Sequence, residues 1–291
     1  MNRPTNRTNT RRLWPLFVLL ASGCSSESPT SDERLVPPAP AIPGTAFNAT
    51  QVGRLQGKVV WTAAIPETPG FLYGVPRDDG LGFAFRMAEN PNRPHIDATT
   101  KALADAVVFL RQLDAARGRP WNLPPVRVEM ADGRITVVQG DRRSRVGFVR
   151  RGDVISVSSA EPVYHVLRGR GAAFFSLTLP EPNSPIVRTL SNLGRVELSS
   201  GTGLYWASAD LLVTDHPYYT LTDANGHFAF DQVPVGPVDV IVWLPGWTPT
   251  RQERDPDSTT ITRQSYGPPL ERCVSTNVAS GAVAEVTLRV P

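Results

Sequence analysis

Tyr219 to Trp247 reads YTLTDANGHFAFDQVPVGPVDVIVWLPGW, and this stretch decides the fold that we expect for the chain. Its alternation of apolar and polar residues predicts strands at 218–222, 227–230 and 238–244. Asn225-Gly226 suits the positive φ angles of a type I′ turn, so we expect a hairpin at 223–228. The string Asp-x-Asn-Gly also begins calcium-binding loops, but the acidic ligands that would follow are missing, which favours the turn.

Short strands recur along the rest of the chain. The clearest pair is VRVEM and RITVVQ, joined by Asp132-Gly133, which predicts a hairpin. Further strands are expected at 55–61, 104–110, 145–149, 153–158, 164–168, 171–179, 196–199, 211–215 and 283–290. The chain has 28 Pro and 23 Gly and little helical periodicity. We therefore expect an all-β protein of two β-sandwich units.

The net charge of +3 belongs to the N-terminus. Of 30 basic residues, Arg3, Arg7, Arg11 and Arg12 precede the first acidic residue, Glu27. Without residues 1–23 the chain has 26 basic and 27 acidic side chains, a net charge of −1. This balance excludes nucleic acid as the expected partner.

The N-terminus has the parts of an export signal: arginines, the apolar run LWPLFVLLA and small residues. The run is shorter than the roughly 20 apolar residues that span a bilayer. Its end, Ala21-Ser22-Gly23-Cys24, resembles the lipobox of bacterial lipoproteins. The resemblance implies cleavage after Gly23 and a lipid on Cys24, with 24–50 as a flexible Ser/Pro-rich tether. A secreted protein is the alternative, and Arg11-Arg12 leaves twin-arginine export open beside the general route.

Two family resemblances follow from longer motifs. The strings GKVVW, ADAVVFL and YTLTDANGHFAFDQVPVGPVDVIVWLPGW resemble the carboxypeptidase regulatory-like domain, a transthyretin-like sandwich, although Val238 replaces its usual tyrosine. This resemblance covers 54–118 and 216–291. It implies an accessory binding or folding unit without peptidase machinery.

The intervening segment, 119–215, carries RRGDVISVSSAEPVYH at 150–165 and VTDHPYYTLTD at 213–223. It resembles the cupredoxin-like domain of methylamine-utilisation-like envelope proteins. The resemblance implies a Greek-key β-barrel inserted between the second and third strands of the sandwich. It also places a copper ligand at His165 and the remaining ligands in the loop SSGTGLYW, 199–206.

Type 1 copper needs two imidazoles, a thiolate and a weak axial group. By the resemblance the cysteine, histidine and methionine positions hold Gly201, Leu204 and Ala207, and none of these binds metal. We therefore expect no cofactor, with His165 a vestigial ligand that is partly buried and hydrogen-bonded to a backbone carbonyl. Trp206, which the related loop also carries, is expected to close the barrel end by packing.

Nucleophilic catalysis needs a nucleophile, a base and an orienting acid. Cys273 has only Arg272 beside it to lower its pKa, so a plain strand cysteine is favoured over a reactive one. Asp215 and His216 are adjacent in a strand and face opposite sides, which argues against a direct pair; with Pro217 they are expected to join the two domains. The other histidines, His95 and His227, lie in predicted loops or turns.

Aromatic residues offer a surface for sugars or peptides, although strand aromatics are usually core. Trp206 and Trp247 are the binding candidates, and Trp247 lies in a Pro/Gly loop. The stretch DRRSRVGFVRRGD, 141–153, is expected to be a solvated strand face.

The sequence thus predicts a non-enzymatic lipoprotein of the cell envelope, anchored on the periplasmic face of the outer membrane, that binds or scaffolds an envelope protein or glycan. The alternatives are an electron-transfer or metal-binding protein with an atypical site, a carbohydrate- or peptide-binding surface module, and an envelope hydrolase.

Overall fold

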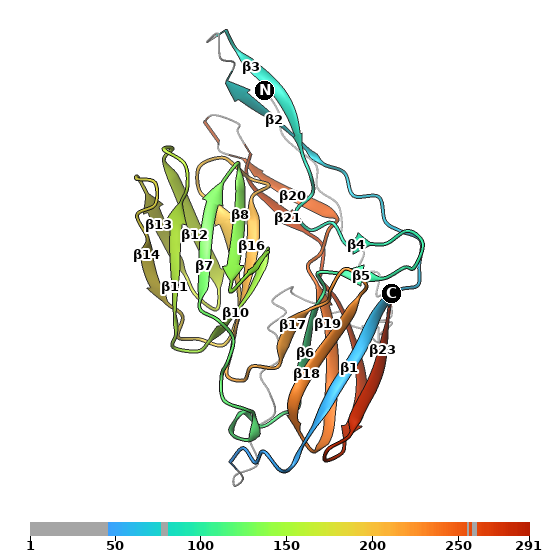
Figure 1. The fold of residues 1–291 in the computed structure, drawn as a ribbon. Helices are drawn as coiled ribbons and strands as arrows, with labels where there is room; N and C mark the ends of the chain where they lie inside the picture. Colours follow the sequence, from blue (N-terminus) through green and yellow to red (C-terminus); the bar gives the residue numbers. More distant parts are fainter. Residues whose placement is uncertain (1–45, 77–80, 255, 258–260) are drawn as a thin grey trace, which may run out of the picture. The chain divides into compact units, whose positions relative to one another are not determined.

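The computed structural model describes residues 46–291 except 77–80, 255 and 258–260. Within these residues the chain forms β-strands and no α-helix, with one short 3-10 helix, η1 (Ala115–Arg117). Figure 1 shows the strands as two sandwiches accompanied by smaller hairpins. The expectation of an all-β chain is confirmed. No helix in this part of the chain is long and apolar enough to cross a membrane.

The first sandwich packs a three-stranded sheet, β18-β1-β23, against a four-stranded sheet, β17-β6-β19-β22. In β1 the alternate residues Leu55, Val59 and Trp61 are buried, as the period of two in a half-buried strand requires. They share one core cluster with Val240 and Leu288 from both sheets. The strands are β1 (Val52–Trp61), β6 (Val107–Arg111), β17 (Tyr219–Leu221), β18 (His227–Pro234), β19 (Gly236–Leu244), β22 (Leu270–Val278) and β23 (Val283–Val290).

The second sandwich, called the inserted barrel here, has two five-stranded sheets, β10-β16-β15-β12-β13 and β14-β11-β7-β8-β9. Its pairs β7–β11 and β10–β16 are parallel, so the chain crosses between the sheets to form them. The strands are β7 (Val126–Ala131), β8 (Arg134–Gln139), β9 (Arg142–Ser144), β10 (Val146–Arg150), β11 (Val154–Ser159), β12 (His165–Gly171), β13 (Phe175–Leu179), β14 (Ile186–Thr189), β15 (Gly194–Ser200) and β16 (Ser208–Thr214). All of them lie between β6 and β17, so the expected insertion is confirmed.

Three two-stranded sheets complete the described fold. They are β2 (Phe71–Pro76) with β3 (Phe83–Ala88), β4 (His95–Ile96) with β5 (Leu103–Ala104), and β20 (Pro249–Arg254) with β21 (Ile261–Tyr266). The sequence patterns missed β2, β3, β4, β14, β20 and β21. Phe71, Tyr73 and Tyr266 from these hairpins pack on the core of the inserted barrel.

The turn at 223–228 differs from the expected hairpin. β17 pairs with β6 and β18 pairs with β1, so the turn passes from one sheet of the first sandwich to the other. Gly226 has a φ of 77° whereas Asn225 is not among the residues with positive φ, so the turn is not type I′. The Asp223 carboxylate stabilises it by accepting the backbone N–H groups of Asn225 and His227, both at 2.8 Å. The Asp132-Gly133 hairpin, in contrast, is confirmed, with φ of 50° and 66° at its two turn residues.

A third apolar cluster joins the inserted barrel to the first sandwich. Phe148 of β10 and Leu212 of β16 meet Phe109 of β6 and Trp243 of β19 in this cluster. Tyr219 stacks on Phe109 with ring centroids 5.0 Å apart and an angle of 4° between the rings. The contact buries the outer faces of two sheets, which explains why β6, β10 and β19 consist almost entirely of buried residues.

Candidate functional site at the end of the inserted barrel

The loop between β15 and β16 holds the three positions at which the family resemblance places metal ligands. The Gly201 N–H donates to the Val166 carbonyl at 2.7 Å, and the Ala207 N–H donates to the Leu204 carbonyl at 2.8 Å. A Cβ at position 201 would lie 2.8 Å from a Val166 methyl, so the loop approaches β12 too closely for a larger residue. Leu204 packs on the barrel core and Ala207 is buried. None of the three side chains offers an atom that can bind a metal, and all three positions are packed against the rest of the barrel.

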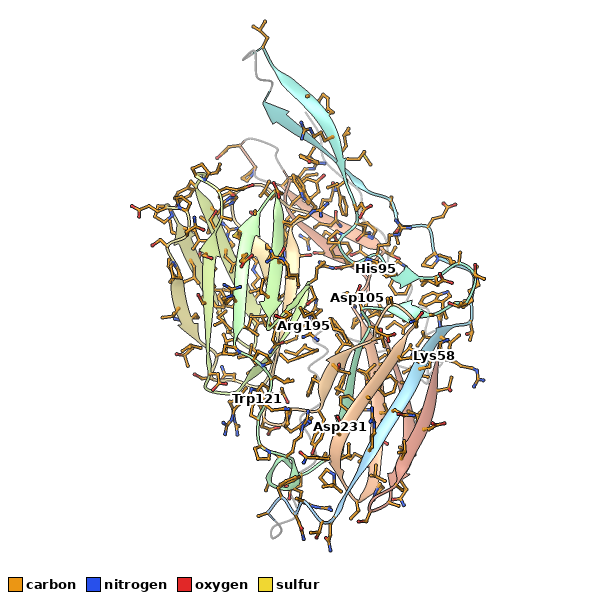
Figure 2. All side chains as sticks on the ribbon, viewed as in Figure 1. Lys58, His95, Asp105, Trp121, Arg195 and Asp231 are labelled. Carbon is orange, nitrogen blue, oxygen red and sulfur yellow. The ribbon has the colours of Figure 1, made fainter. Side chains whose placement is uncertain are left out.

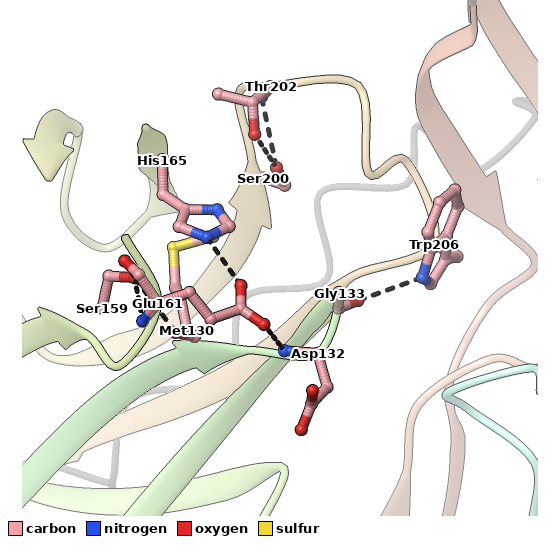
Figure 3. Close-up of polar contacts among 9 residues, drawn as sticks. All are labelled: Met130, Asp132, Gly133, Ser159, Glu161, His165, Ser200, Thr202 and Trp206. Atoms are coloured by element: carbon pink, nitrogen blue, oxygen red, sulfur yellow. Dashed lines mark hydrogen bonds and ion pairs between the residues drawn. The ribbon is translucent and has the colours of Figure 1, made fainter. Parts of the chain in front are cut away.

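His165, the first residue of β12, is buried, with 3% of its surface exposed. Its Nε2 lies 3.1 Å from Glu161 Oε2, and Glu161 Oε1 accepts the Asp132 N–H at 2.5 Å (Figure 3). The expected hydrogen bond to a backbone carbonyl is therefore wrong, because the partner is a carboxylate from the loop between β11 and β12. His165 Nδ1 is buried and finds no hydrogen-bond partner among the residues that the structure describes.

The surroundings of His165 do not fit a type 1 copper centre. Met130 of the neighbouring strand β7 is fully buried in the core of the inserted barrel. Ser200 and Thr202 pair through their hydroxyl groups at 3.1 Å. Among the described residues no group of three or more His, Cys, Asp or Glu side chains is placed to hold a metal ion. Cys273 is the one cysteine among the described residues, and it lies in β22 of the first sandwich. The inserted barrel therefore lacks the thiolate that defines a type 1 copper centre.

Trp206 closes the same end of the barrel. Its Nε1 donates to the Gly133 carbonyl at 3.0 Å, and its ring centroid is 4.4 Å from that of Tyr73. With 8% of its surface exposed, Trp206 presents no stacking face to solvent, contrary to the platform considered from the sequence. The expected packing role is confirmed.

Trp247 lies in the loop after β19 and is half-buried. Its ring meets Trp61 edge-on at 5.7 Å, and its carbonyl accepts the Asn90 side-chain amide at 2.8 Å. Binding by this loop stays a prediction.

His216 lies in the link between β16 and β17 and is buried. Burial lowers its pKa from 6.5 to about 4, and the neighbouring charge of Asp215 opposes this effect only in part. Its Nδ1 accepts the Tyr218 N–H at 3.4 Å. The imidazole is therefore neutral at physiological pH, and its Nδ1 satisfies the backbone N–H of Tyr218.

His95 and Asp105 form a pair that the sequence reading missed, because nothing in their spacing of ten residues signals a contact. The His95 Nδ1 lies 2.7 Å from Asp105 Oδ2, and both side chains are more than half exposed (Figure 2). The hydrogen bond to Asp105 raises the pKa of His95. Asp105 lies between β5 and β6 and has a φ of 57°, in the left-handed region that Asp adopts more readily than most residues.

The arginine stretch is only partly a solvated face. Arg143 is exposed, as expected, and pairs with Glu129 at 2.8 Å. Arg145 instead donates from Nε to the Ser208 carbonyl at 3.0 Å, and from its terminal nitrogens to Ser208 Oγ, Asn92 Oδ1 and the Pro91 carbonyl. Burial lowers the pKa of Arg145. The guanidinium thereby ties the segment before β4 to the start of β16.

An open groove with a volume of about 620 Å³ lies along β1, β18 and β23. Its polar walls include Gln56 and Glu285, which are hydrogen-bonded at 2.9 Å, together with Lys58 and His227. Its lining carries both signs of charge, which suits a polar ligand without a large net charge.

Comparisons with known proteins gave a likeness in structure alone. No family model matches the chain, and no curated protein matches it. The Cu(I) form of one amicyanin mutant aligns with a TM-score of 0.25 and 16% identity, over 31% of this chain and 82% of that chain. A second Cu(I) amicyanin mutant aligns with a TM-score of 0.25 and 15% identity, over 34% of this chain and 89% of that chain. An oxidised amicyanin mutant aligns with a TM-score of 0.24 and 11% identity, over 33% of this chain and 96% of that chain. At this level the alignments bear on neither ligand nor activity.

Proposed function

We propose that the chain is a lipid-anchored protein of the cell envelope with a binding or scaffolding role, in which the inserted barrel works without copper and without catalysis. The observation that carries this proposal is the loop between β15 and β16. Gly201, Leu204 and Ala207 stand at the inferred ligand positions, offer no donor atoms and are closed by packing.

The strongest competing function is electron transfer with an atypical metal site. It would have to use His165, whose Nε2 is already engaged by Glu161. A single imidazole does not hold a transition metal at useful affinity. The metal content of the full chain purified from envelopes tests this directly: we expect less than one equivalent of any transition metal, unchanged in His165→Ala. Stoichiometric metal that His165→Ala removes would establish the competing function.

Two observations support a non-enzymatic role. Burial raises the pKa of the Cys273 thiol, which disfavours the reactive thiolate. His216 is buried and neutral, and its Nδ1 is occupied by a backbone N–H. A screen of ester, peptide and glycan substrates should show no turnover, and turnover that His95→Ala abolishes would make the exposed His95–Asp105 pair an active site instead.

Anchoring rests on Gly23 and Cys24, which lie outside the described residues. The expected signal cleavage after Gly23 leaves Cys24 as the lipid acceptor at the mature N-terminus. In phase separation with a nonionic detergent, the mature protein should enter the detergent phase, whereas Cys24→Ser should remain in the aqueous phase. Equal partition of the two proteins would favour the secreted alternative.

The binding role is assigned to the groove along β1, β18 and β23. Its mixed charge suits an envelope glycan or a polar peptide of an envelope protein. Cross-linking in detergent-solubilised envelopes, followed by capture of the chain, should recover one partner from the native protein. Lys58→Glu, which reverses one charge in the groove, should lower that recovery; Arg289→Glu, on β23 but outside the groove lining, is the matched control.

A further inference from the structure

The two-stranded sheet of β2 and β3 carries large apolar side chains on both faces. One face is used within the molecule. Phe71 meets Tyr205 with ring centroids 5.7 Å apart, and Tyr73 lies 4.4 Å from Trp206, so this face covers the end of the inserted barrel. The Tyr205 hydroxyl also donates to the Leu72 carbonyl at 3.2 Å.

The other face, called the outer face here, consists of Leu72, Phe85 and Met87. Leu72 and Met87 stand directly opposite each other in the register, and Phe85 is two residues from Met87, so all three point the same way. Their exposed fractions are 59%, 71% and 63%. The solvent side of an antiparallel sheet is normally polar, so three large apolar side chains here indicate a surface that becomes covered.

The size of the outer face argues against a protein partner of its own. Two strands of six residues give a face of about 20 Å by about 10 Å, or roughly 200 Å². A stable protein interface buries about 800 Å² on each partner. The same shortfall applies to a second copy of the chain. A bilayer sets no such minimum when the protein is already held beside it.

The chain that precedes the described residues supplies this condition. About 20 residues separate the proposed lipid acceptor Cys24 from Ala46, and an extended segment of that length reaches at most about 70 Å. A flexible coil of that number of residues has an r.m.s. span of only about 25 Å. The effective concentration of bilayer around the folded part is therefore high, so a weak contact becomes populated.

We propose that the outer face of β2 and β3 docks on the lipid surface to which the N-terminus is anchored. Leu72, Phe85 and Met87 enter the boundary between headgroups and acyl chains, as the apolar face of an interfacial element does. Docking fixes the orientation of the inserted barrel relative to the membrane through the packing of Phe71 and Tyr73. This inference rests on the proposed function in one respect, the lipid on Cys24 that tethers the natural protein to the membrane.

The test supplies the tether artificially, so that it does not depend on lipidation of Cys24. A hexahistidine tag replaces residues 1–24, so that the protein begins with the tag followed by residue 25. Cys273→Ser removes the remaining thiol, and an environment-sensitive fluorophore is attached at Phe85→Cys. The matched control carries the fluorophore at Phe174→Cys, which replaces another exposed aromatic, in the inserted barrel. Both proteins are bound to vesicles of phosphatidylethanolamine, phosphatidylglycerol and a nickel-chelating lipid.

We expect a several-fold rise in fluorescence at position 85, quenched by nitroxide-labelled lipid, and little change at position 174. Leu72→Ser with Met87→Ser should reduce the rise at position 85. Equal signals at the two positions, or none at either, would overturn the proposal. It would also be overturned by a rise at position 85 without vesicles that grows with protein concentration and accompanies a dimer in sedimentation, because the occupant would then be a second copy. Failure of natural lipidation would appear in the detergent partition of Cys24→Ser and would leave this result readable.

Discussion

At the scale of single residues, His216 links the fold to pH. Its pKa falls from 6.5 in the unfolded chain to about 4 in the buried link between β16 and β17. Below pH 6.5 the unfolded state therefore binds a proton that the folded state does not. The contribution of His216 to stability is complete above pH 6.5 and is lost as the pH falls toward 4, by at most about 3 kcal/mol.

His216→Asn isolates this effect, because the asparagine side-chain oxygen can accept the Tyr218 N–H in place of Nδ1. Urea unfolding at pH 7.5 and pH 4.5 should show a larger loss of stability in the native chain than in the variant. An identical loss in both proteins would mean that unfolding does not change the protonation of His216.

Glu161 is the hydrogen-bond partner of the buried His165. Glu161→Ala leaves both imidazole nitrogens buried without a partner, since Nδ1 has none already. We expect a loss of about 1–3 kcal/mol in the free energy of unfolding, measured in urea. Glu161→Gln keeps an acceptor oxygen near Nε2 and should lose less. Equal losses in the two variants would show that the hydrogen bond to His165 contributes nothing.

At the scale of elements, the turn between β17 and β18 depends on Gly226. Its φ is 77°, and a Cβ there would lie 2.6 Å from the Val59 carbonyl oxygen. Gly281 separates the two effects: its φ is 67°, and apart from its chain neighbours no atom of the described residues lies within 4 Å of a Cβ built there. Gly281→Ala should lose about 1 kcal/mol for the backbone conformation alone. Gly226→Ala should lose clearly more in thermal unfolding; similar losses would mean that the turn yields without strain.

Arg145 and Arg143 lie in one arginine-rich stretch, but Arg145 binds buried backbone carbonyls whereas Arg143 forms an exposed ion pair. Arg145→Gln should lower the free energy of unfolding by about 2–3 kcal/mol, because the Ser208 and Pro91 carbonyls lose a charged donor. Arg143→Gln removes only an exposed ion pair with Glu129 and should lose less than about 1 kcal/mol. Denaturant unfolding compares the two variants. A larger loss of stability in Arg143→Gln than in Arg145→Gln would refute the role of Arg145 in joining the segment before β4 to β16.

Element by element, the sequence predicted the strands whose side chains alternate or are wholly apolar. It missed β2 and β3 because both faces of that sheet are apolar, so the alternation that marks a half-buried strand is absent. It misread the turn at Asn225-Gly226, since local turn chemistry does not say in which sheet the next strand will pair. Asp132-Gly133 was read correctly because its two strands are direct neighbours.

At the scale of the whole molecule, the insertion could be predicted because the segments before and after residues 119–215 resemble one family, whereas residues 119–215 resemble another. The candidate site could be predicted only as residue types: Gly201, Leu204 and Ala207 cannot bind metal wherever they lie. The contact between Glu161 and His165 depends on how the loop between β11 and β12 folds back, and the Arg145 contacts join residues far apart in sequence. No local pattern encodes either.

The inserted barrel has a filled end where a copper centre would need open ligands. Addition of Cu(II) to the full mature chain, followed by visible and electron paramagnetic resonance spectra after removal of loosely bound metal, tests it most directly. We predict no intense copper–thiolate absorption and no bound Cu(II) signal, in the native protein and in His165→Ala alike. One equivalent of tightly bound copper with a thiolate charge-transfer band, lost in His165→Ala, would contradict the account.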